Sequence, residues 1–279
     1  MIQGTSSGAG KTVLVSAFCR IFSNMGYQVA PFKAQNMSSS AYKIKNTSEQ
    51  IALAQAIQAV ASRTKPDVRM NPVLLKPLGD YRSMIIVGGR LYREMHAKEY
   101  YEKFVLQRGL PFSLKELEGL RKENDLVIIE GAGSPAEINI LKYDMANMLL
   151  AHKVKAPVIM TSDIERGGCF ASIVGTMELL KPIHRRLIKG FIINKFRGDE
   201  SLLKPAIESV EKITRRQFFG TIPRIDFSLP NEDSLNGQAS DKTVTSEEHW
   251  NRQINIIAKT VLKSIDIDKL SAKVIGLSK

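Results

Sequence analysis

The segment "GTSSGAGKT", residues 4–12, restricts the fold of this chain more than any other feature. A short apolar stretch precedes it and an amphipathic helical pattern follows it. A glycine-rich turn between a strand and a helix presents backbone N–H groups and a positive helix end, and both favour phosphate oxygens. We therefore predict a nucleotide phosphate-binding loop. Its expected nucleotide contacts are Gly8, Ala9, Gly10, Lys11 and Thr12.

The spacing inside this loop is unusual. The common form has four residues between its two glycines, whereas Gly4 and Gly10 enclose "TSSGA", one residue more. We expect Lys11 to reach the β- and γ-phosphates and the Thr12 hydroxyl to bind Mg²⁺. Only "MIQ" precedes Gly4, which is short beside a typical strand of about five residues. We interpret the sequence as starting too late or as a fragment.

Apolar β-branched runs alternate with amphipathic helical patterns along most of the chain. This alternation predicts an α/β fold of the P-loop NTPase type, with a mainly parallel twisted sheet and helices on both faces. The predicted strands are residues 1–3, 27–33, 126–130, 157–161, 190–194 and 218–222. We also expect a helix over residues 13–25, a helix starting near Thr47, which has capping-box spacing to Gln50, and a hairpin over residues 83–92.

The chain divides by composition into three parts. We predict a P-loop synthetase domain over residues 1–228 and a polar linker or loop over residues 229–248, where no periodicity is found. A terminal helical pattern over residues 249–279 is expected to pack back on the domain.

Composition limits the class of protein. No apolar run approaches the roughly 18 residues that cross a bilayer, so we expect a cytoplasmic protein with no membrane contact. Cys19 and Cys169 fit neither a disulfide framework nor a metal-spaced cluster. The net charge of +12 suits an anionic small substrate or a solvated surface. Basic runs with interleaved aromatics are missing from the sequence, so we expect no nucleic-acid partner.

Two acidic residues directly follow apolar strands. "DLVIIEGAG" places Glu130 at a strand end, and "APVIMTSDIERGG" places Asp163 at the next. Open α/β sheets bind ligands beyond the carboxyl ends of their strands, and nucleotide chemistry uses an acidic group to hold its metal ion. One such carboxylate is equally well a helix cap, but two of them, each before a glycine-rich turn, favour a site.

Polar residues at two further strand ends are weaker candidates. In "VAPFKAQNM", Lys33 could neutralise a phosphoryl group or a carboxylate, and Gln35 and Asn36 could hydrogen-bond the same substrate. In "FIINKFRGD", Asn194 could bind the edge of a base. By spacing alone, a surface lysine and a turn or cap asparagine explain these positions equally well.

Six segments together resemble one known family. They are "QGTSSGAGKT", "APFKAQNM", "MNPVLLKP", "IEGAGSPAEINI", "DIERGGCFASIVGT" and "GFIINKFRGD". Over residues 1–234 the chain resembles the ATP-dependent synthetase domain of the cobyric acid synthase family of cobalamin biosynthesis. That domain is similar in fold to dethiobiotin synthetase, whose loop has the same expanded spacing. The resemblance therefore accounts for the extra residue in the loop.

The resemblance implies a ligase reaction. Mg-ATP would phosphorylate peripheral carboxylates of (adenosyl)cobyrinic acid a,c-diamide, and ammonia would convert each acyl phosphate into a carboxamide, giving cobyric acid. By the same resemblance Lys11 stabilises the transferring phosphoryl group and Lys33 orients the carboxylate or acyl phosphate. Asp144 handles the corrinoid or the ammonia, and Asp163 lies near the metal and the γ-phosphate. The remaining implied roles are metal binding by Thr12, Glu130 and Glu49, adenine binding by Asn194, and substrate binding by Gln35, Asn36, Gly131 and Asn139.

The family also carries a C-terminal glutaminase domain, and this sequence ends at Lys279 without a segment that matches it. We therefore expect the nitrogen to come from free ammonium or from a separate glutaminase subunit. A homodimer is an expectation by analogy with similar folds.

Alternative functions stay open at this point. A cobyrinic acid a,c-diamide synthase and a dethiobiotin synthetase-like ligase share the loop and the strand-end carboxylates, although "EGAGSPAEINI" and "MNPVLLKP" disfavour them. A partitioning-type nucleotide-switch ATPase usually has an extra lysine early in the loop, where this chain has Ser6. A non-catalytic remnant is opposed by the intact Lys11, Thr12 and Glu130.

Overall fold

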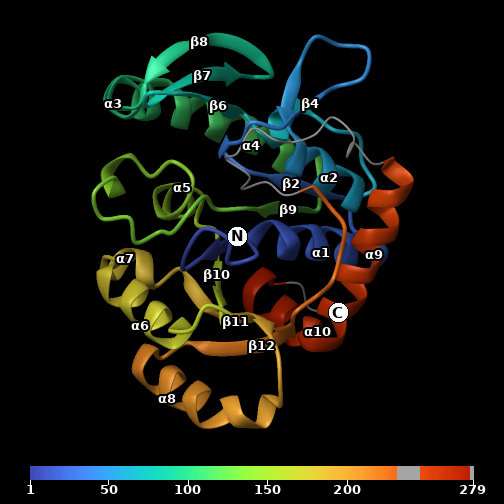
Figure 1. Ribbon diagram of the computed structural model, residues 1–279, viewed down its shortest axis with the longest axis vertical. Coiled ribbons are helices and arrows are strands. Elements are labelled where there is room, and N and C mark those ends of the chain that lie inside the picture. The colour runs from blue at the N-terminus through green and yellow to red at the C-terminus, as the bar shows by residue number, and fades with distance from the viewer. Residues whose placement is uncertain (231–245, 277–279) are drawn as a thin grey trace. The chain divides into compact units, whose positions relative to one another are not determined.

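The computed structural model describes residues 1–230 and 246–276, and these form two compact units (Figure 1). The first unit contains Met1–Leu14, Gly131–Asp226 and Ile256–Lys279, and the second contains Val15–Glu130 and Phe227–Asn255. The predicted linker, residues 229–248, falls mainly on residues 231–245, which lie outside the described part of the chain. Among the described residues, no helix combines the length and the apolar character needed to cross a membrane.

The first unit contains a parallel sheet with strand order β1-β10-β11-β12. The strands are β1 (Ile2–Gly4), β10 (Val158–Asp163), β11 (Ile188–Phe196) and β12 (Gln217–Pro223). β10 is buried along its whole length, as expected for a parallel strand with both faces covered. Because all four strands run the same way, their carboxyl ends meet at one edge. Asp163 and Asn194 pair with each other at this edge, and Gly4 pairs with Thr161, two residues before Asp163.

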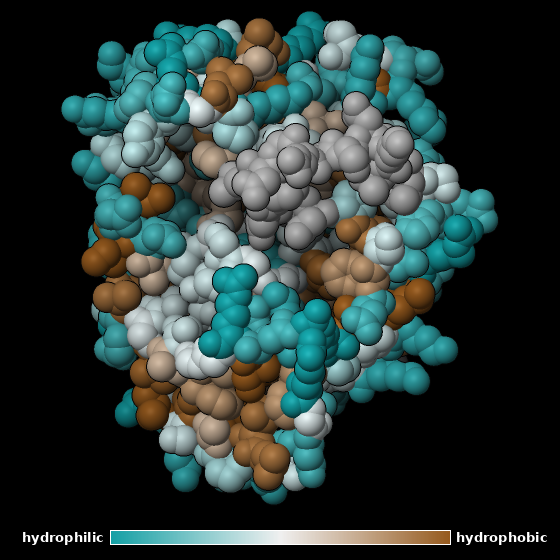
Figure 2. Space-filling view, in the orientation of Figure 1, coloured by the Kyte–Doolittle hydropathy of each residue, from teal (hydrophilic) through white to brown (hydrophobic). Residues whose placement is uncertain are grey.

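The helices of the first unit are α5 (Met148–Val154), α6 (Cys169–Leu179), α7 (Pro182–Arg185), α8 (Lys204–Thr214) and α10 (Ile267–Leu270). Of these, α5, α6 and α8 contribute to one apolar cluster that packs on this sheet. The cluster joins Met148, Met160, Ile173, Phe191 and Val210, which come from α5, β10, α6, β11 and α8. In Figure 2 hydrophilic side chains cover much of the visible face, and apolar ones show at the level of α6 and α8.

The second unit is built from three small sheets. β2 (Val29–Phe32) pairs in parallel with β9 (Leu126–Ile129). A mixed sheet has the order β3-β6-β7-β8, with β3 (Gln35–Met37), β6 (Val73–Gly79), β7 (Arg82–Val87) and β8 (Arg90–His96). β4 (Ala41–Lys43) and β5 (Gln50–Ala52) form an antiparallel pair. The helices are α2 (Leu53–Ala61), α3 (Ala97–Glu99) and α4 (Leu110–Glu123), and a π-helical turn, Tyr100–Gly109, joins α3 to α4.

Two long helices complete the fold, α1 (Lys11–Asn24) directly after the loop and α9 (Glu247–Ser264) near the end of the chain. The six predicted strands, the first helix and the hairpin are confirmed, and so is the α/β class with its parallel sheet. The helix predicted to start near Thr47 is wrong, because β5 occupies Gln50–Ala52 and α2 begins only at Leu53. The Thr47 hydroxyl instead donates to the Ile44 carbonyl and accepts from the Glu49 N–H, a local turn that short hydroxyl side chains favour over a helix.

Candidate nucleotide site and a second buried polar cluster

The loop between β1 and α1 has the backbone that a phosphate site needs. Gly8 and Gly10 have φ angles of 71° and 92°, a region that residues with a Cβ rarely adopt. A Cβ added at Gly10 would lie 1.9 Å from Asn194 Nδ2, so this position also requires glycine for space. α1 begins directly afterwards at Lys11, and its first N–H groups have no partners inside the helix. The loop and the helix start therefore fit a phosphate group.

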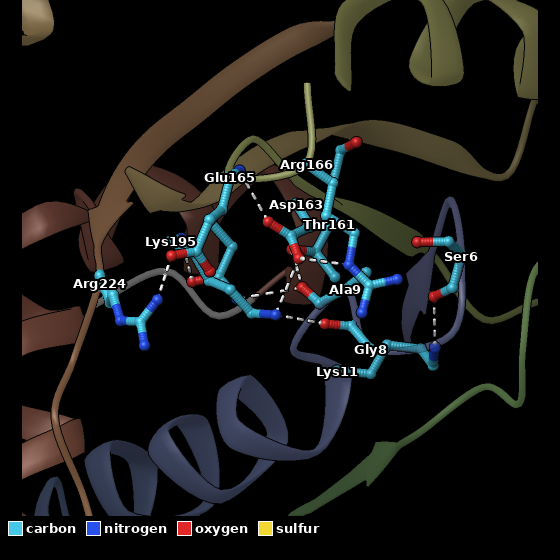
Figure 3. Close-up of polar contacts among 12 residues, drawn as sticks. Ser6, Gly8, Ala9, Lys11, Thr161, Asp163, Glu165, Arg166, Lys195 and Arg224 are labelled. Atoms are coloured by element: carbon cyan, nitrogen blue, oxygen red, sulfur yellow. Dashed lines mark hydrogen bonds and ion pairs between the residues drawn. The ribbon is translucent and has the colours of Figure 1, made fainter. Parts of the chain in front are cut away.

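Lys11 is folded back over this loop (Figure 3). Its Nζ donates to the carbonyls of Ser6 and Gly133, each at 3.0 Å. Both acceptors are uncharged, so an anionic phosphate oxygen would compete well for the ammonium group. Thr12 occupies the second position of α1. The structure thus keeps the lysine predicted to bind phosphates close to the loop.

Asn194 supports the loop from the end of β11. Its Nδ2 donates to the Ala9 carbonyl at 3.0 Å, and its Oδ1 accepts the N–H of Lys195 at 2.9 Å. The Thr161 hydroxyl donates to the same Ala9 carbonyl at 3.4 Å. Both ends of the Asn194 amide are therefore engaged here, and adenine binding by this side chain stays a prediction.

Lys195 is a site residue that the sequence analysis missed. Its Nζ donates to the Gly8 carbonyl and to Asp163 Oδ2, both at 2.8 Å (Figure 3). The sequence signal that could identify Lys195 is its position directly after Asn194, near the end of a strand. Neighbouring residues of a regular strand point to opposite faces, so this position alone does not indicate that Lys195 reaches the same loop as Asn194.

Asp163 is the acidic centre of this part of the first unit. It is 7% exposed, and its Oδ1 accepts the N–H of Glu165 at 2.8 Å. Its Oδ2 contacts Lys195 and lies 4.0 Å from Arg166 Nε. Glu165 in turn pairs with Arg224, as Figure 3 shows, and with an arginine at position 197. Lys195 is the cation of this group that also contacts the loop, through the Gly8 carbonyl.

Asp144 lies four residues before the start of α5, and burial raises the pKa of its carboxyl to about 6. Its Oδ1 accepts the N–H of Asn147 at 2.9 Å, and its Oδ2 accepts that of Met148 at 3.0 Å. These bonds satisfy N–H groups of the first turn. A carboxyl group with such a pKa can exchange a proton near neutrality.

Asn147 holds the chain that follows β9. Its side chain accepts the N–H of Ala132 at 3.1 Å and donates to the carbonyl of the same residue at 2.6 Å. A Cβ at Gly131 would lie 2.2 Å from Asn147 Oδ1, which explains the first glycine of "EGAGS". These two hydrogen bonds fix the backbone just before Gly133, whose carbonyl accepts a hydrogen bond from Lys11 Nζ. Asn139, predicted to bind substrate, is exposed in a turn of this segment.

The second unit contains a separate buried polar cluster. Lys33 Nζ lies 2.8 Å from Glu130 Oε1, with side-chain exposures of 6% and 0%. Gln58 Nε2 donates to Glu130 Oε2 at 2.5 Å, and Gln55 Nε2 donates to Gln58 Oε1 at 3.3 Å. Asn36 Nδ2 completes the series by donating to Gln55 Oε1 at 2.8 Å. Three predicted residues, Lys33, Asn36 and Glu130, are thus joined by two glutamines of α2 that the sequence analysis did not single out.

The other predicted residues of the second unit have contacts of their own. Gln35 Oε1 accepts the hydroxyl of Tyr100 at 2.8 Å. Glu49 pairs with Arg90 at 3.1 Å, whereas Glu130 pairs with Lys33. The described part of the chain contains no group of three or more His, Cys, Asp or Glu side chains arranged to hold a metal ion. Mg²⁺ commonly takes only one or two carboxylates together with substrate phosphates, so a phosphate loop with an adjacent threonine fits that ion.

The parallel sheet, the loop and Lys11 define a nucleotide-binding P-loop domain of α/β type. The chain belongs to the CobQ/CobB/MinD/ParA nucleotide-binding domain family, which matches residues 1–234. It is similar to the probable cobyric acid synthase of Thermococcus kodakarensis, with 53% identity over 239 residues, 84% of this chain and 48% of that protein. The cobyric acid synthase of Dehalococcoides mccartyi is 51% identical over 236 residues, 84% of this chain and 46% of that protein.

The chain spans about half the length of the curated relatives it matches. Among solved structures, the cell-division ATPase MinD of Pyrococcus furiosus aligns with 94% of this chain and 98% of its own, at 13% identity and a TM-score of 0.44. A likeness at that level adds nothing to the family match.

Proposed function

We propose that this chain is the carboxylate-activating part of a cobyric acid synthase. In this proposal it amidates peripheral carboxylates of cobyrinic acid a,c-diamide at the expense of ATP, with ammonia from free ammonium or from a separate glutaminase. The identity of about 50% with proteins named cobyric acid synthase supports the substrate. The observation that carries the nucleotide chemistry is Lys11, held over a glycine-rich loop by two backbone carbonyls.

The proposed reaction has two steps. An oxygen of the substrate carboxylate attacks the γ-phosphorus, the bond to ADP breaks, and an acyl phosphate forms. Ammonia then attacks the acyl carbon, phosphate leaves with the former carboxylate oxygen, and a proton is lost to give the carboxamide. ATP supplies the phosphoryl group that makes the carboxylate a good acyl donor.

In this proposal, each predicted site residue of the first unit has a role in nucleotide binding, catalysis or substrate binding. The loop N–H groups hold the phosphates, and Lys11 stabilises the negative charge that develops on the transferring phosphoryl group. Thr12 would hold Mg²⁺, and Asp163 would act on the same metal and phosphate group by its charge. Asp144, whose pKa is about 6, accepts the proton that ammonia loses or contacts the corrinoid. Asn194 contacts adenine, and Gly131 and Asn139 contact the substrate.

Residues of the second unit complete the proposal. Glu130 and Glu49 are metal ligands, Lys33 orients the substrate carboxylate, and Gln35 and Asn36 bind the substrate. Lys33 and Gln58 each donate to one oxygen of Glu130, so a metal ion bound by Glu130 would share this carboxylate with them or replace them. The proposed domain limits are residues 1–228, 229–248 and 249–279, and the proposed assembly is a homodimer.

The test is a mass-spectrometric assay with Mg-ATP, ammonium and cobyrinic acid a,c-diamide. We expect stepwise conversion of carboxylates into carboxamides by the wild-type chain and none by Lys11→Met, which keeps the side-chain stem but removes the ammonium group. Lys153→Met, at an exposed position of α5, is the control and should keep full activity. An unchanged substrate mass with a wild-type chain that binds Mg-ATP would refute the ligase function.

A further inference from the structure

Two consecutive residues at the end of β11 bind two consecutive carbonyls of the phosphate loop. Asn194 donates to the carbonyl of Ala9, and Lys195 donates to the carbonyl of Gly8. Figure 3 shows the Lys195 side chain extending between Asp163 and the loop. All these residues belong to the first unit, so the arrangement is internal to that unit.

The backbone at Lys195 makes this double contact possible. Consecutive side chains of a regular strand point to opposite faces of the sheet, so Asn194 and Lys195 could not both reach one loop from an extended chain. Lys195 has a φ of 62°, in the left-handed region that is unfavourable for residues other than glycine. Such strain persists where the surrounding structure requires it, commonly at functional sites. Here it turns the lysine toward the same loop that Asn194 supports.

Anchoring the two carbonyls also orients the loop N–H groups. The carbonyl of one residue and the N–H of the next belong to a single planar trans peptide and point in opposite directions. Because the carbonyls of Gly8 and Ala9 point toward Lys195 and Asn194, the N–H groups of Ala9 and Gly10 point away from them. These are the donors that a glycine-rich loop offers to a phosphate.

Asp163 keeps the lysine in place. Its side chain is 5% exposed and lies 2.8 Å from the Lys195 ammonium, which is itself 31% exposed. Hydrogen bonds with a charged donor are stronger than neutral ones, so the Gly8 carbonyl is held by a firmly placed cation.

We propose that Lys195 is a positioning residue that preorganises the phosphate loop for a nucleoside polyphosphate. This inference rests on the proposed function, since it requires that the loop binds ATP. Lys195 acts through the Gly8 carbonyl and needs no contact with the nucleotide.

The experiment is isothermal titration calorimetry of Mg-ATP, Mg-ADP and adenosine with the full chain. Lys195→Met keeps the aliphatic part of the side chain but removes the charged donor. Methionine has a Cβ, as lysine does, so the backbone strain at this φ is the same in both proteins. A lost hydrogen bond to a charged group predicts binding of Mg-ATP and Mg-ADP weakened about ten-fold or more. Adenosine has no phosphate, so its affinity should stay unchanged. Lys195→Arg should recover most of the loss, because it restores a charged donor.

The matched control is Arg197→Met, which removes one positive charge two residues further along. Arg197 pairs with Glu165, 2.9 Å away, and is largely exposed; we expect unchanged affinities. Equal affinities of Lys195→Met and wild type for Mg-ATP would overturn the inference, as would an equal loss for adenosine. A lower melting temperature with unchanged affinities would assign Lys195 a structural role only and also overturn it. A wild-type chain without affinity for Mg-ATP would refute the proposed function itself, and the inference with it.

Discussion

The two units each contain a lysine–carboxylate pair with the same separation but different surroundings. Lys195 and Asp163 in the first unit, and Lys33 and Glu130 in the second, both lie 2.8 Å apart. The Lys195 side chain is 31% exposed and also binds a loop carbonyl. The Lys33 and Glu130 side chains are 6% and 0% exposed, and Gln58 binds the second oxygen of Glu130.

Two ion pairs with equal distances can therefore have different roles, set by their burial and by their other partners. A partly exposed pair is screened by water and contributes less to stability than a buried one, so the main consequence of the Lys195–Asp163 pair is the placement of the lysine beside the loop. A buried pair is held because either charge alone would be left in a poorly solvating interior. We therefore expect substitutions at Lys195 to change mainly ligand binding, and substitutions at Lys33 to destabilise the fold in addition to removing its proposed contact with the substrate.

The largest effect is expected when the buried pair is broken. Lys33→Met removes the ammonium group that pairs with the buried Glu130 carboxylate, and breaking a buried pair typically destabilises by about 3–5 kcal/mol. Urea unfolding at neutral pH should show this loss. The double variant Lys33→Met/Glu130→Leu should recover part of the stability. A loss below about 1 kcal/mol for Lys33→Met would show that this pair behaves like a surface pair.

Asp144 is a largely buried carboxyl group that forms no ion pair with the residues the structure describes, so it can be compared with the two lysine–carboxylate pairs. Burial raises the pKa of Asp144 from 3.8 to about 6, so the folded state binds its proton more tightly than the unfolded state. The stabilising contribution of this group is fully present below pH 3.8 and is lost as the pH rises through 6, by up to about 3 kcal/mol.

The Asp144→Asn variant isolates this contribution, because its amide does not titrate in this range. Unfolding free energies of the two proteins should diverge between about pH 4 and pH 6, with the variant gaining relative to wild type as the pH rises. Parallel profiles across that interval would contradict the raised pKa.

The next effect is expected in the phosphate loop, where a side chain added at Gly10 would be crowded by Asn194. In Gly10→Ala the new Cβ meets Asn194 Nδ2 at 1.9 Å and the residue must keep a φ of 92°. We expect a loss of about 1–3 kcal/mol from the backbone conformation, together with loss of Mg-ATP binding. Gly133→Ala is the matched control, because Gly133 also has a positive φ but no atom lies within 4 Å of its added Cβ. Equal losses of stability in the two variants would mean that the Asn194 contact is unimportant.

The smallest effect is expected at Glu49, whose pair with Arg90 has side-chain exposures of 25% and 74%. Glu49→Gln should change the unfolding free energy by less than about 1 kcal/mol. The Mg²⁺ dependence of turnover provides an independent measure of the metal role proposed for Glu49. A stability loss comparable to that of Lys33→Met would contradict the distinction between exposed and buried pairs.

Much of the first unit can be predicted from sequence, because its signals are local. The loop, its lysine and the strand-end positions of Asp163 and Asn194 follow from short apolar strands and glycine-rich turns. Lys195 could not be found in this way, since its direction depends on one left-handed residue, φ 62°, that no residue type demands. Thr47 misled the prediction because a hydroxyl that caps a helix can equally close a turn.

The polar cluster of the second unit was harder to predict. Gln55 and Gln58 look like ordinary polar positions of a helix, yet both are completely buried. Their partners, Asn36 and Glu130, lie 19 and 72 residues away in the chain. Only the tertiary structure brings such groups together, so the sequence alone could propose Lys33 and Glu130 as site residues but could not show that they form a closed pair.

The most direct test of the account follows the oxygen atoms of the substrate. Cobyrinic acid a,c-diamide carrying heavy oxygen in its free carboxylates is incubated with the chain, Mg-ATP and ammonium, and the released phosphate is analysed by mass spectrometry. Carboxylate activation at the P-loop predicts that each carboxamide formed releases one phosphate carrying one heavy oxygen. Carboxamide formation with unlabelled phosphate would contradict an acyl phosphate and with it the role assigned to this loop.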